Sequence, residues 1–239
     1  MERTSSDADA IALARRVADA HGATLADANT AAVRLHLSAG GPAFRLKGQG
    51  DAFADVHATV RLGAQTVRFQ GTDWRAEVGG RELAERYRNL NRGRRRLRWT
   101  RDDAATFGGA ALWTYTNLPF LLTTDRLAMS YGGHHTERGE RWQVLKLEFP
   151  PDVATHSPRQ SVYVDDDGMI CRHDYVARAF GRWVASAHYL EDFKDFGGIT
   201  LATRRHVHPR LGGRSVRRPT VVAIRVHDAE LVRWDTPCE

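Results

Sequence analysis

Residues 161–190 have the sequence SVYVDDDGMICRHDYVARAFGRWVASAHYL, and this stretch decides the fold. It contains three runs in which apolar and polar residues alternate, Ser161–Val164, Met169–Ala177 and Ala185–Leu190. A DDDG tetrapeptide separates the first two runs, and a Phe-Gly pair lies between the second and third. Strand patterns divided by turn residues are typical of consecutive antiparallel strands. The stretch therefore predicts two successive hairpins.

The same pattern continues on both sides of this stretch. Trp142–Phe149 precedes it, and Ile199–His208 and Thr220–His227 follow it. Six consecutive strands with short turns predict an antiparallel meander, and a sheet of that size usually curls. Earlier strands are expected at Ala31–Leu37 and Val56–Leu62, and again at 65–71. The prediction is a curved antiparallel half-barrel.

Two segments of the chain differ from this β pattern. Ile11, Ala14, Val17 and Ala18 have helical spacing, which predicts an N-terminal helix that ends at His21-Gly22, and 81–87 predicts a short helix. Phe107–Leu122 is the most apolar and aromatic segment, and its Pro119 is expected to interrupt any regular helix or strand. We expect this segment to plug the open side of the sheet or to line a cavity. The predicted fold class is mainly β (α+β), in one domain over residues 1–239.

Composition restricts the function. The chain has 239 residues, 42% of them hydrophobic and 27% charged, which is ordinary for a globular domain. Its two cysteines, Cys171 and Cys238, do not form a disulfide framework, which favours a reducing compartment. The polar N-terminus does not resemble a signal peptide, and no apolar run approaches the roughly 20 residues of a membrane span. We expect a cytoplasmic protein without integral membrane association.

The net charge is +6, and arginine supplies nearly all of the positive charge. The densest basic segment, Arg92–Arg98, could contact phosphates, but no aromatic platform or groove-reading helix accompanies it. A solvated loop explains the segment, and we expect no nucleic-acid partner.

Several motifs resemble one bacterial family of single-domain proteins of about this length, for most of which no function is assigned. The resemblance runs from about Phe53 to the end of the chain. Six motifs carry the resemblance. They are FGGAALWTYTNLPFLL at 107–122, ATHSPRQ at 154–160, YVDDDG at 163–168, RHDY at 172–175, AHY at 187–189 and TRRHVHP at 203–209. The layout of helix, curved sheet and apolar plug is also similar to the lipoprotein-carrier fold of LolA and LolB. That likeness implies an incomplete barrel whose concave face holds an apolar guest; fold analogy does not transfer function.

The RHDY motif supplies the best candidate catalytic residues. On a strand, His173 and Tyr175 share one face with Cys171, and this face is apolar enough to point inward. A buried imidazole tends to stay neutral, and a neutral imidazole can act as a general base. On the next strand, either His188 or Tyr189 would face the same side as His173. The alternative is a hydrogen-bonded core histidine that keeps the sheet in register.

A His-x-His pair, His206 and His208, suggests a possible metal site. Both would share a face with Arg204, while Arg205 would point to the other face. A third ligand would have to come from Asp174, His188 or His227, and the flanking arginines would repel a cation. We therefore expect no metal and no cofactor, with His206 and His208 as the ligands if a metal does bind.

Three functional hypotheses follow. The first is a cofactor-independent enzyme, a cyclase or isomerase acting on a hydrophobic, polyketide-like or lipid-like substrate. Its expected catalytic residues are His173, Tyr175 and His188, and its expected substrate-binding residues are Trp113, Tyr115, Phe120, Tyr163, Tyr189, Arg204 and Arg205. The second is a non-catalytic carrier or sequestering protein for an apolar metabolite or lipid. The third is a metal-dependent hydrolase. The enzyme and the carrier each need only a hydrophobic small molecule as partner. The sequence predicts no oligomeric state.

Overall fold

The strands of the described residues form one open, curved, antiparallel sheet. The computed structural model describes residues 5–23, 31–216 and 218–234, so Cys238 lies outside the described residues. The helices are α1 (Ser5–Ala20), α2 (Pro42–Leu46), α3 (Gly80–Arg88) and α4 (Arg101–Leu121), with a 3₁₀ helix η1 (Gly93–Arg96). The strands are β1 (Ala31–Gly40), β2 (Phe53–Arg61), β3 (Thr66–Gly71), β4 (Arg75–Gly79), β5 (Ala128–Glu137), β6 (Glu140–Glu148), β7 (Arg159–Val164), β8 (Ile170–Val176), β9 (Ala185–Asp195), β10 (Thr200–Leu211), β11 (Arg214–Ser215) and β12 (Val222–Arg233).

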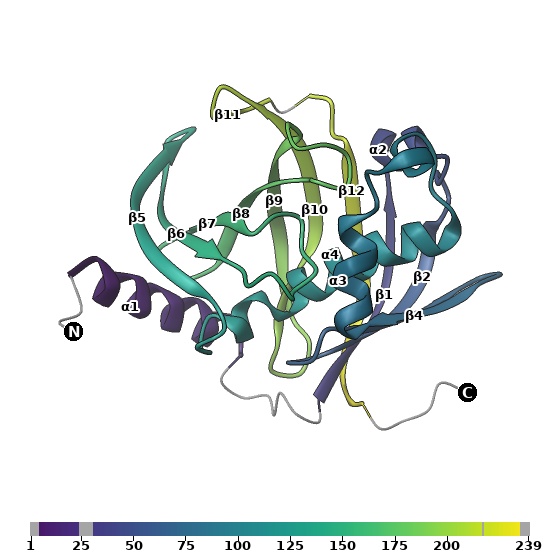
Figure 1. Ribbon diagram of the computed structural model, residues 1–239. Helices are drawn as coiled ribbons and strands as arrows, with labels where there is room; N and C mark the ends of the chain where they lie inside the picture. Colours follow the sequence, from purple (N-terminus) through teal and green to yellow (C-terminus); the bar gives the residue numbers. More distant parts are fainter. Residues whose placement is uncertain (1–4, 24–30, 217, 235–239) are drawn as a thin grey trace.

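The predicted meander is confirmed. The strand order is β4-β3-β2-β1-β12-β10-β9-β8-β7-β6-β5, with β11 paired to β10, so neighbours in the sheet are mostly neighbours in sequence. β12 pairs with β1 and joins the N-terminal strands to the C-terminal meander. Figure 1 shows the sheet curving from β5 past β9 and β10 to β1 and β2, with α3 and α4 on one side of it. The sheet remains open between β4 and β5, as expected for a half-barrel.

The apolar segment predicted to be a plug forms the C-terminal two thirds of α4. Sixteen of the 21 residues of this helix are buried, which is typical of a helix covered on all sides. The expectation that Pro119 breaks the helix is wrong. Pro119 lies in the last turn, where a missing N–H removes only the bond to the carbonyl of Tyr115. The helix begins at a capping box in which the Thr100 hydroxyl accepts from the Asp103 N–H and the Asp103 carboxylate accepts from the Thr100 N–H.

The sequence reading missed several short elements and one long strand. The long strand is β5, which contains His134 and His135 and which no alternation in the sequence predicted. Their segment lacks clear alternation because Gly132 and Gly133 sit at a register shift between Tyr131 and His134, and pairing with β6 defines the strand. α2, β4 and β11 were also not predicted, since each is too short to show a periodicity.

Two glycines let α4 approach the sheet closely. A Cβ at Gly108 would lie 2.6 Å from the Cζ of Phe53 on β2, and a Cβ at Gly109 would overlap the Cγ2 of Val78 on β4. Mid-helix glycine costs about 1 kcal/mol relative to alanine. The close packing of α4 against β2 and β4 offsets that cost.

The N-terminal helix is confirmed, and it ends where the sequence predicts. α1 buries Leu13 and Val17, and the chain turns at Gly22, whose φ is 73°. His21 then fixes the helix to β10 by a 2.9 Å hydrogen bond between its Nδ1 and the carbonyl of Thr200. Of the helices in the described residues, none is both long and apolar enough to span a membrane.

The close approach at Gly109 can be tested by a double-mutant cycle. Gly109→Ala should lower the free energy of unfolding by about 1–3 kcal/mol, because the new methyl overlaps Val78. In a Val78→Ala background the space exists, and the same change should stabilise by up to about 1 kcal/mol through helix propensity. Urea unfolding of the four proteins measures both effects. Equal effects in the two backgrounds would contradict the packing described.

Candidate functional site

The alternation of β8, β9 and β10 divides their polar residues between two faces. His173 pairs with His188 across β8 and β9, and Val207 pairs with His188 across β9 and β10. These residues, with Tyr175 and Arg205, lie on the face that packs against α4, here called the helix-side face. Arg172, Asp174 and Tyr189 lie on the opposite face. His188, not Tyr189, therefore faces the same side as His173.

A buried chain of hydrogen bonds links α3, α4 and β8. His156, in the loop before β7, bridges two tyrosines, with its Nδ1 3.0 Å from the Tyr87 hydroxyl and its Nε2 2.7 Å from the Tyr115 hydroxyl. The Tyr115 and Tyr175 hydroxyls are 2.9 Å apart. His156 also stacks on the Tyr175 ring, with ring centroids 4.1 Å apart. Each hydroxyl in this chain has a protein partner, so the chain is a satisfied structural network.

His173 belongs to a second buried network. Its Nε2 donates to the Gln160 side-chain oxygen, and the Gln160 amide donates to the Thr155 hydroxyl at 2.7 Å and to the Ser157 carbonyl at 2.7 Å. Thr114 on α4 reaches the same Thr155 hydroxyl at 3.3 Å. This matches the alternative in which His173 is a hydrogen-bonded core histidine.

Burial determines the protonation of these groups. It lowers the pKa of His156 and of His173 to about 3, and it holds the pKa of His188 well below its ordinary value. It also raises the pKa of the Tyr175 hydroxyl well above 10. All four groups are neutral near pH 7. An imidazole with a pKa near 3 is a weak general base at that pH, because catalytic efficiency falls as the pKa moves away from the working pH.

An apolar slot lies between α4 and the helix-side face. Its free volume is about 60 Å³. Its wall consists almost entirely of aliphatic and aromatic groups, with the Tyr115 and Tyr175 side chains supplying the polar atoms. The members are Leu37, Ala39, Phe44, Phe53, Phe69, Phe107, Gly108, Ala111, Leu112, Tyr115, Tyr175, Val207, Val222 and Ile224. The partly exposed residues of this wall are Ala39, Gly108, Leu112, Tyr115 and Ile224, and they mark its mouth.

A smaller cavity, the Arg205 chamber, lies under the last turns of α4. Its free volume is about 20 Å³, and it is enclosed by Tyr115, Leu118 and Pro119 of α4 and by strand residues that include His173 and Arg205. Tyr115 belongs to the walls of both the slot and the chamber. Of the predicted site residues, the structure thus brings Tyr115, Tyr175, His173, His188 and Arg205 together.

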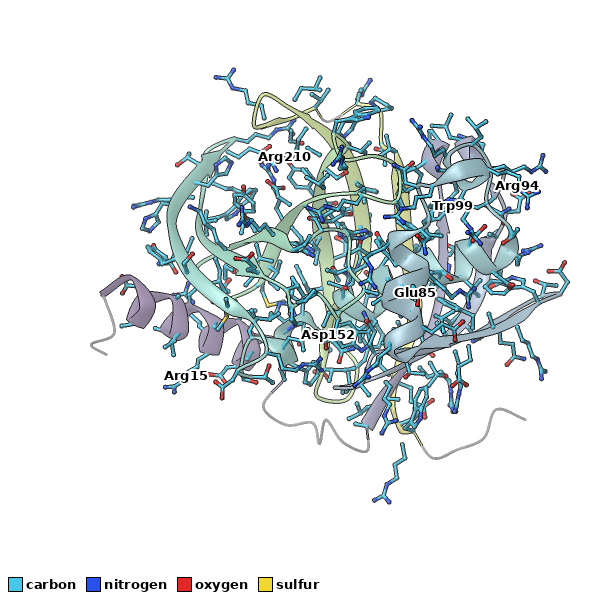
Figure 2. The ribbon with its side chains drawn as sticks, in the orientation of Figure 1. Arg15, Glu85, Arg94, Trp99, Asp152 and Arg210 are labelled. Atoms are coloured by element: carbon cyan, nitrogen blue, oxygen red, sulfur yellow. The ribbon has the colours of Figure 1, made fainter. Side chains whose placement is uncertain are left out.

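The opposite face carries a buried ionic network. Arg172 donates to both carboxylate oxygens of Asp174, at 2.7 and 2.8 Å, and to Glu137 at 2.9 Å. Arg210 is 3.1 Å from Asp174 and lies near β11 in Figure 2. The Tyr163 hydroxyl donates to Asp174 at 2.8 Å, and the Tyr189 hydroxyl donates to Glu137 at 2.9 Å. Tyr163 and Tyr189 were expected to bind substrate beside His173, but the structure places them in this network, since adjacent strand residues point to opposite faces.

The remaining predicted residues lie outside the slot. Arg204 is partly exposed and bonds to Asp192 at 2.8 Å, so Arg205 alone of that pair points inward. Trp113 is fully buried and donates its indole N–H to the Ala64 carbonyl at 3.0 Å, which gives it a structural role. Phe120 is in the hydrophobic core near the end of α4.

His206 and His208 do not lie in a metal-binding cluster. His206 has Glu191 at 3.8 Å, and the His208 ring packs edge-on to Tyr189. Within residues 5–23, 31–216 and 218–234, no three His, Cys, Asp or Glu side chains are grouped so that they could hold a metal ion.

Nothing in the sequence indicated the role of His156, which bridges Tyr87 and Tyr115 in the interior. His156 lies between Pro151 and Pro158 in a stretch without strand or helix periodicity, so its burial had no local signal. Gln160 on β7 and Tyr87 on α3 lie in regular elements, and they were missed because their partners are 13 and 69 residues away in sequence.

Comparisons with known proteins give similarity of fold only. No family model and no curated protein matches the chain. Among solved structures, it is similar to a DUF1329 family protein from Desulfovibrio piger, at 13% identity over 99% of this chain and 96% of that chain, with a TM-score of 0.48. It is also similar to a LolA superfamily protein from Nitrosomonas europaea, at 11% identity over 91% of this chain and 92% of that chain, with a TM-score of 0.45. A LolA-type protein is thus among the structures that the chain resembles, as the sequence predicts.

The buried histidines predict a steep loss of stability in acid. Their pKa values are lower in the folded chain than the ordinary value of 6.5, so the unfolded chain binds more protons below that pH. Each histidine contributes stability that is present above pH 6.5 and is lost as the pH falls towards the folded value. Each such histidine changes the free energy of unfolding by about 1.4 kcal/mol per pH unit in this range. His188→Phe should therefore make the dependence shallower by about that amount near pH 5.

Urea unfolding of the wild type and His188→Phe at pH 8, 6, 5.5 and 5 measures the two slopes. At pH 8 the imidazole of His188 is neutral in both the folded and the unfolded state, so this point serves as the reference for each protein. If the free energy of unfolding fell equally steeply in both proteins between pH 6 and pH 5, that result would contradict the burial of a neutral imidazole at this position.

Proposed function

We propose that this protein is a non-catalytic binding protein for an apolar small molecule, which it holds in the slot between α4 and the sheet. The observation that carries the proposal is the composition of the slot wall. Its members are apolar apart from Tyr115 and Tyr175, and these two hydroxyls already bond to each other. Such a wall offers little to a polar ligand and favours the transfer of hydrocarbon from water, at roughly 25 cal/mol per Å² buried.

The slot opens where its wall is least tightly packed. The partly exposed Leu112 on α4 faces the mouth, and Phe44 reaches the wall from the short helix α2. Left-handed glycines flank α2, Gly41 with φ of 133° and Gly48 with φ of 71°. The free volume of about 60 Å³ accommodates only a few methylene groups, so a larger guest requires Phe44 or Leu112 to move. Phe44 stands on a five-residue helix between two connecting segments, and such segments are more mobile than the sheet that they join.

Binding has more support in this geometry than turnover. His173 lies on the wall of the Arg205 chamber and not on that of the slot, and its Nε2 is engaged by Gln160. The Tyr115 and Tyr175 hydroxyls are held in the chain with His156. The cofactor-independent cyclase or isomerase stays a prediction. Its expected acid–base groups His173 and Tyr175 are already engaged in hydrogen bonds within the protein. We further propose a cytoplasmic location, in keeping with the scarcity of cysteine.

Filling the slot tests the proposal. The neutral fluorophore N-phenyl-1-naphthylamine should bind the wild type at one site with enhanced emission, because the slot is apolar. Ala111→Trp places an indole in the slot from α4, and should weaken binding at least tenfold. Ala54→Trp, at an exposed position on β2, adds the same side chain outside the slot and should leave binding unchanged.

Circular dichroism and thermal melts of both variants confirm that each is folded. A wild type that does not bind the fluorophore, or an Ala111→Trp protein that is folded and binds it undiminished, would remove the slot as the binding site.

A further inference from the structure

The structure contains two buried arginines with opposite surroundings. Arg172 is 1% exposed and bonds to Asp174 and Glu137. Arg205 is 7% exposed, and across the described part of the chain no carboxylate lies within 4 Å of its guanidinium. Its one hydrogen bond runs from Nε to the Ala202 carbonyl at 3.3 Å. The terminal nitrogens of the Arg205 fork are thus available to a ligand.

An unpaired buried cation is costly, and burial lowers the pKa of Arg205 to about 10. The group still carries its charge at pH 7. The nearest rings give only weak compensation, with the guanidinium carbon 5.6 Å from the centre of the Tyr115 ring. A residue that only stabilised the fold would not need a charge here, since an aliphatic side chain of similar volume avoids the desolvation cost.

His188 lies beside Arg205 and is also without a polar partner. It is fully buried, and neither of its ring nitrogens has a hydrogen-bond partner in the described residues. Arg205 pairs with Leu190 on β9, so His188, two residues away on the same face, is its diagonal neighbour. A neutral imidazole carries one N–H, which can donate to an anion. Two donors on adjacent strands therefore remain unused on one patch of the helix-side face.

This patch is continuous with the apolar slot. Arg205 and Val207 are alternate residues of β10, about 7 Å apart on the same face, and Val207 belongs to the slot wall. Ile224, directly opposite Arg205 on β12, is also a slot residue. Tyr115 separates the slot from the Arg205 chamber and belongs to both walls. A guest that extends from the slot past Tyr115 would therefore reach Arg205.

We propose that the guest is an amphipathic carboxylic acid, with its hydrocarbon chain in the slot and its carboxylate on Arg205, assisted by His188. This rests on the proposed function and adds the class of ligand. The fork of a guanidinium matches a planar carboxylate in two parallel hydrogen bonds. The chamber, with about 20 Å³ free, suits that small planar group better than a bulkier phosphate. Binding would neutralise Arg205 and give His188 a partner.

Titration calorimetry at pH 7.5 with decanoic acid and decan-1-ol tests the proposal, because the two share a hydrocarbon chain and differ in charge. The wild type should bind decanoate at least tenfold more tightly than decanol. Arg205→Met should bind both within about threefold of each other. Arg204→Met, which removes an exposed arginine from the neighbouring position, should keep the wild-type preference. Arg205→Lys retains the charge but not the fork, and should show an intermediate preference.

Thermal melts without ligand separate a binding role from a structural one. Arg205→Met should melt at the wild-type temperature or a few degrees above it, because the variant removes an uncompensated buried charge. A melting temperature several degrees lower would show that Arg205 stabilises the empty fold, and would overturn the proposal.

The outcomes also separate this proposal from the proposed function. Equal affinities of the wild type for decanoate and decanol, both abolished by Ala111→Trp, would overturn the carboxylate site and leave the slot in place. Tight decanoate binding that Ala111→Trp does not affect would overturn the slot and leave an anion site at Arg205. A preference for decanoate that persists in Arg205→Met would overturn the assignment to Arg205.

Discussion

The structure depends on the enclosure of α4. This helix is buried on nearly every side, so it cannot lie on the surface of a flat sheet and must be surrounded. The curved sheet provides that surrounding surface, and Gly108 and Gly109 allow the helix backbone to approach β2 and β4. The apolar slot lies in the same interface, and Gly108 and Phe53 belong to its wall. The cavity is thus a product of the same packing that stabilises the domain.

Strand alternation then gives the two faces of β8–β10 different chemistry. The opposite face collects charges that neutralise one another, with Arg172 and Arg210 against Asp174 and Glu137. The helix-side face collects neutral hydrogen-bonded groups around His156 and His173, together with Arg205. Both faces are buried, so the difference lies in whether the polar groups have partners inside the protein. Among the described residues, His188 has no hydrogen-bond partner and Arg205 has only the Ala202 carbonyl, and buried groups in that state require an explanation beyond the structural network.

The interior also shows why many histidines do not imply catalysis. His156 and His173 are desolvated and hydrogen-bonded, and burial lowers their pKa values to about 3, which keeps them neutral near pH 7. Groups in that state stiffen the contacts between α4 and the sheet. A catalytic base would need access to a substrate and a pKa nearer to the working pH.

By itself, the sequence determined the local features of this protein. Period-two alternation defined the meander and the faces of its strands, so His173 and Tyr175 could be assigned to the interior and Arg205 to the face opposite Arg204. Helical spacing defined α1, and apolar composition marked α4. What only the tertiary structure decided is which of these groups have partners. His156 comes from an aperiodic loop, Gln160 on β7 bonds to His173 on β8, and Tyr163 and Tyr189 join an ionic network on the other face. Among the described residues, no carboxylate pairs with Arg205 as Asp174 pairs with Arg172. Strand periodicity is a property of adjacent residues, whereas charge pairing depends on residues tens of positions apart that meet only when the sheet curves around α4.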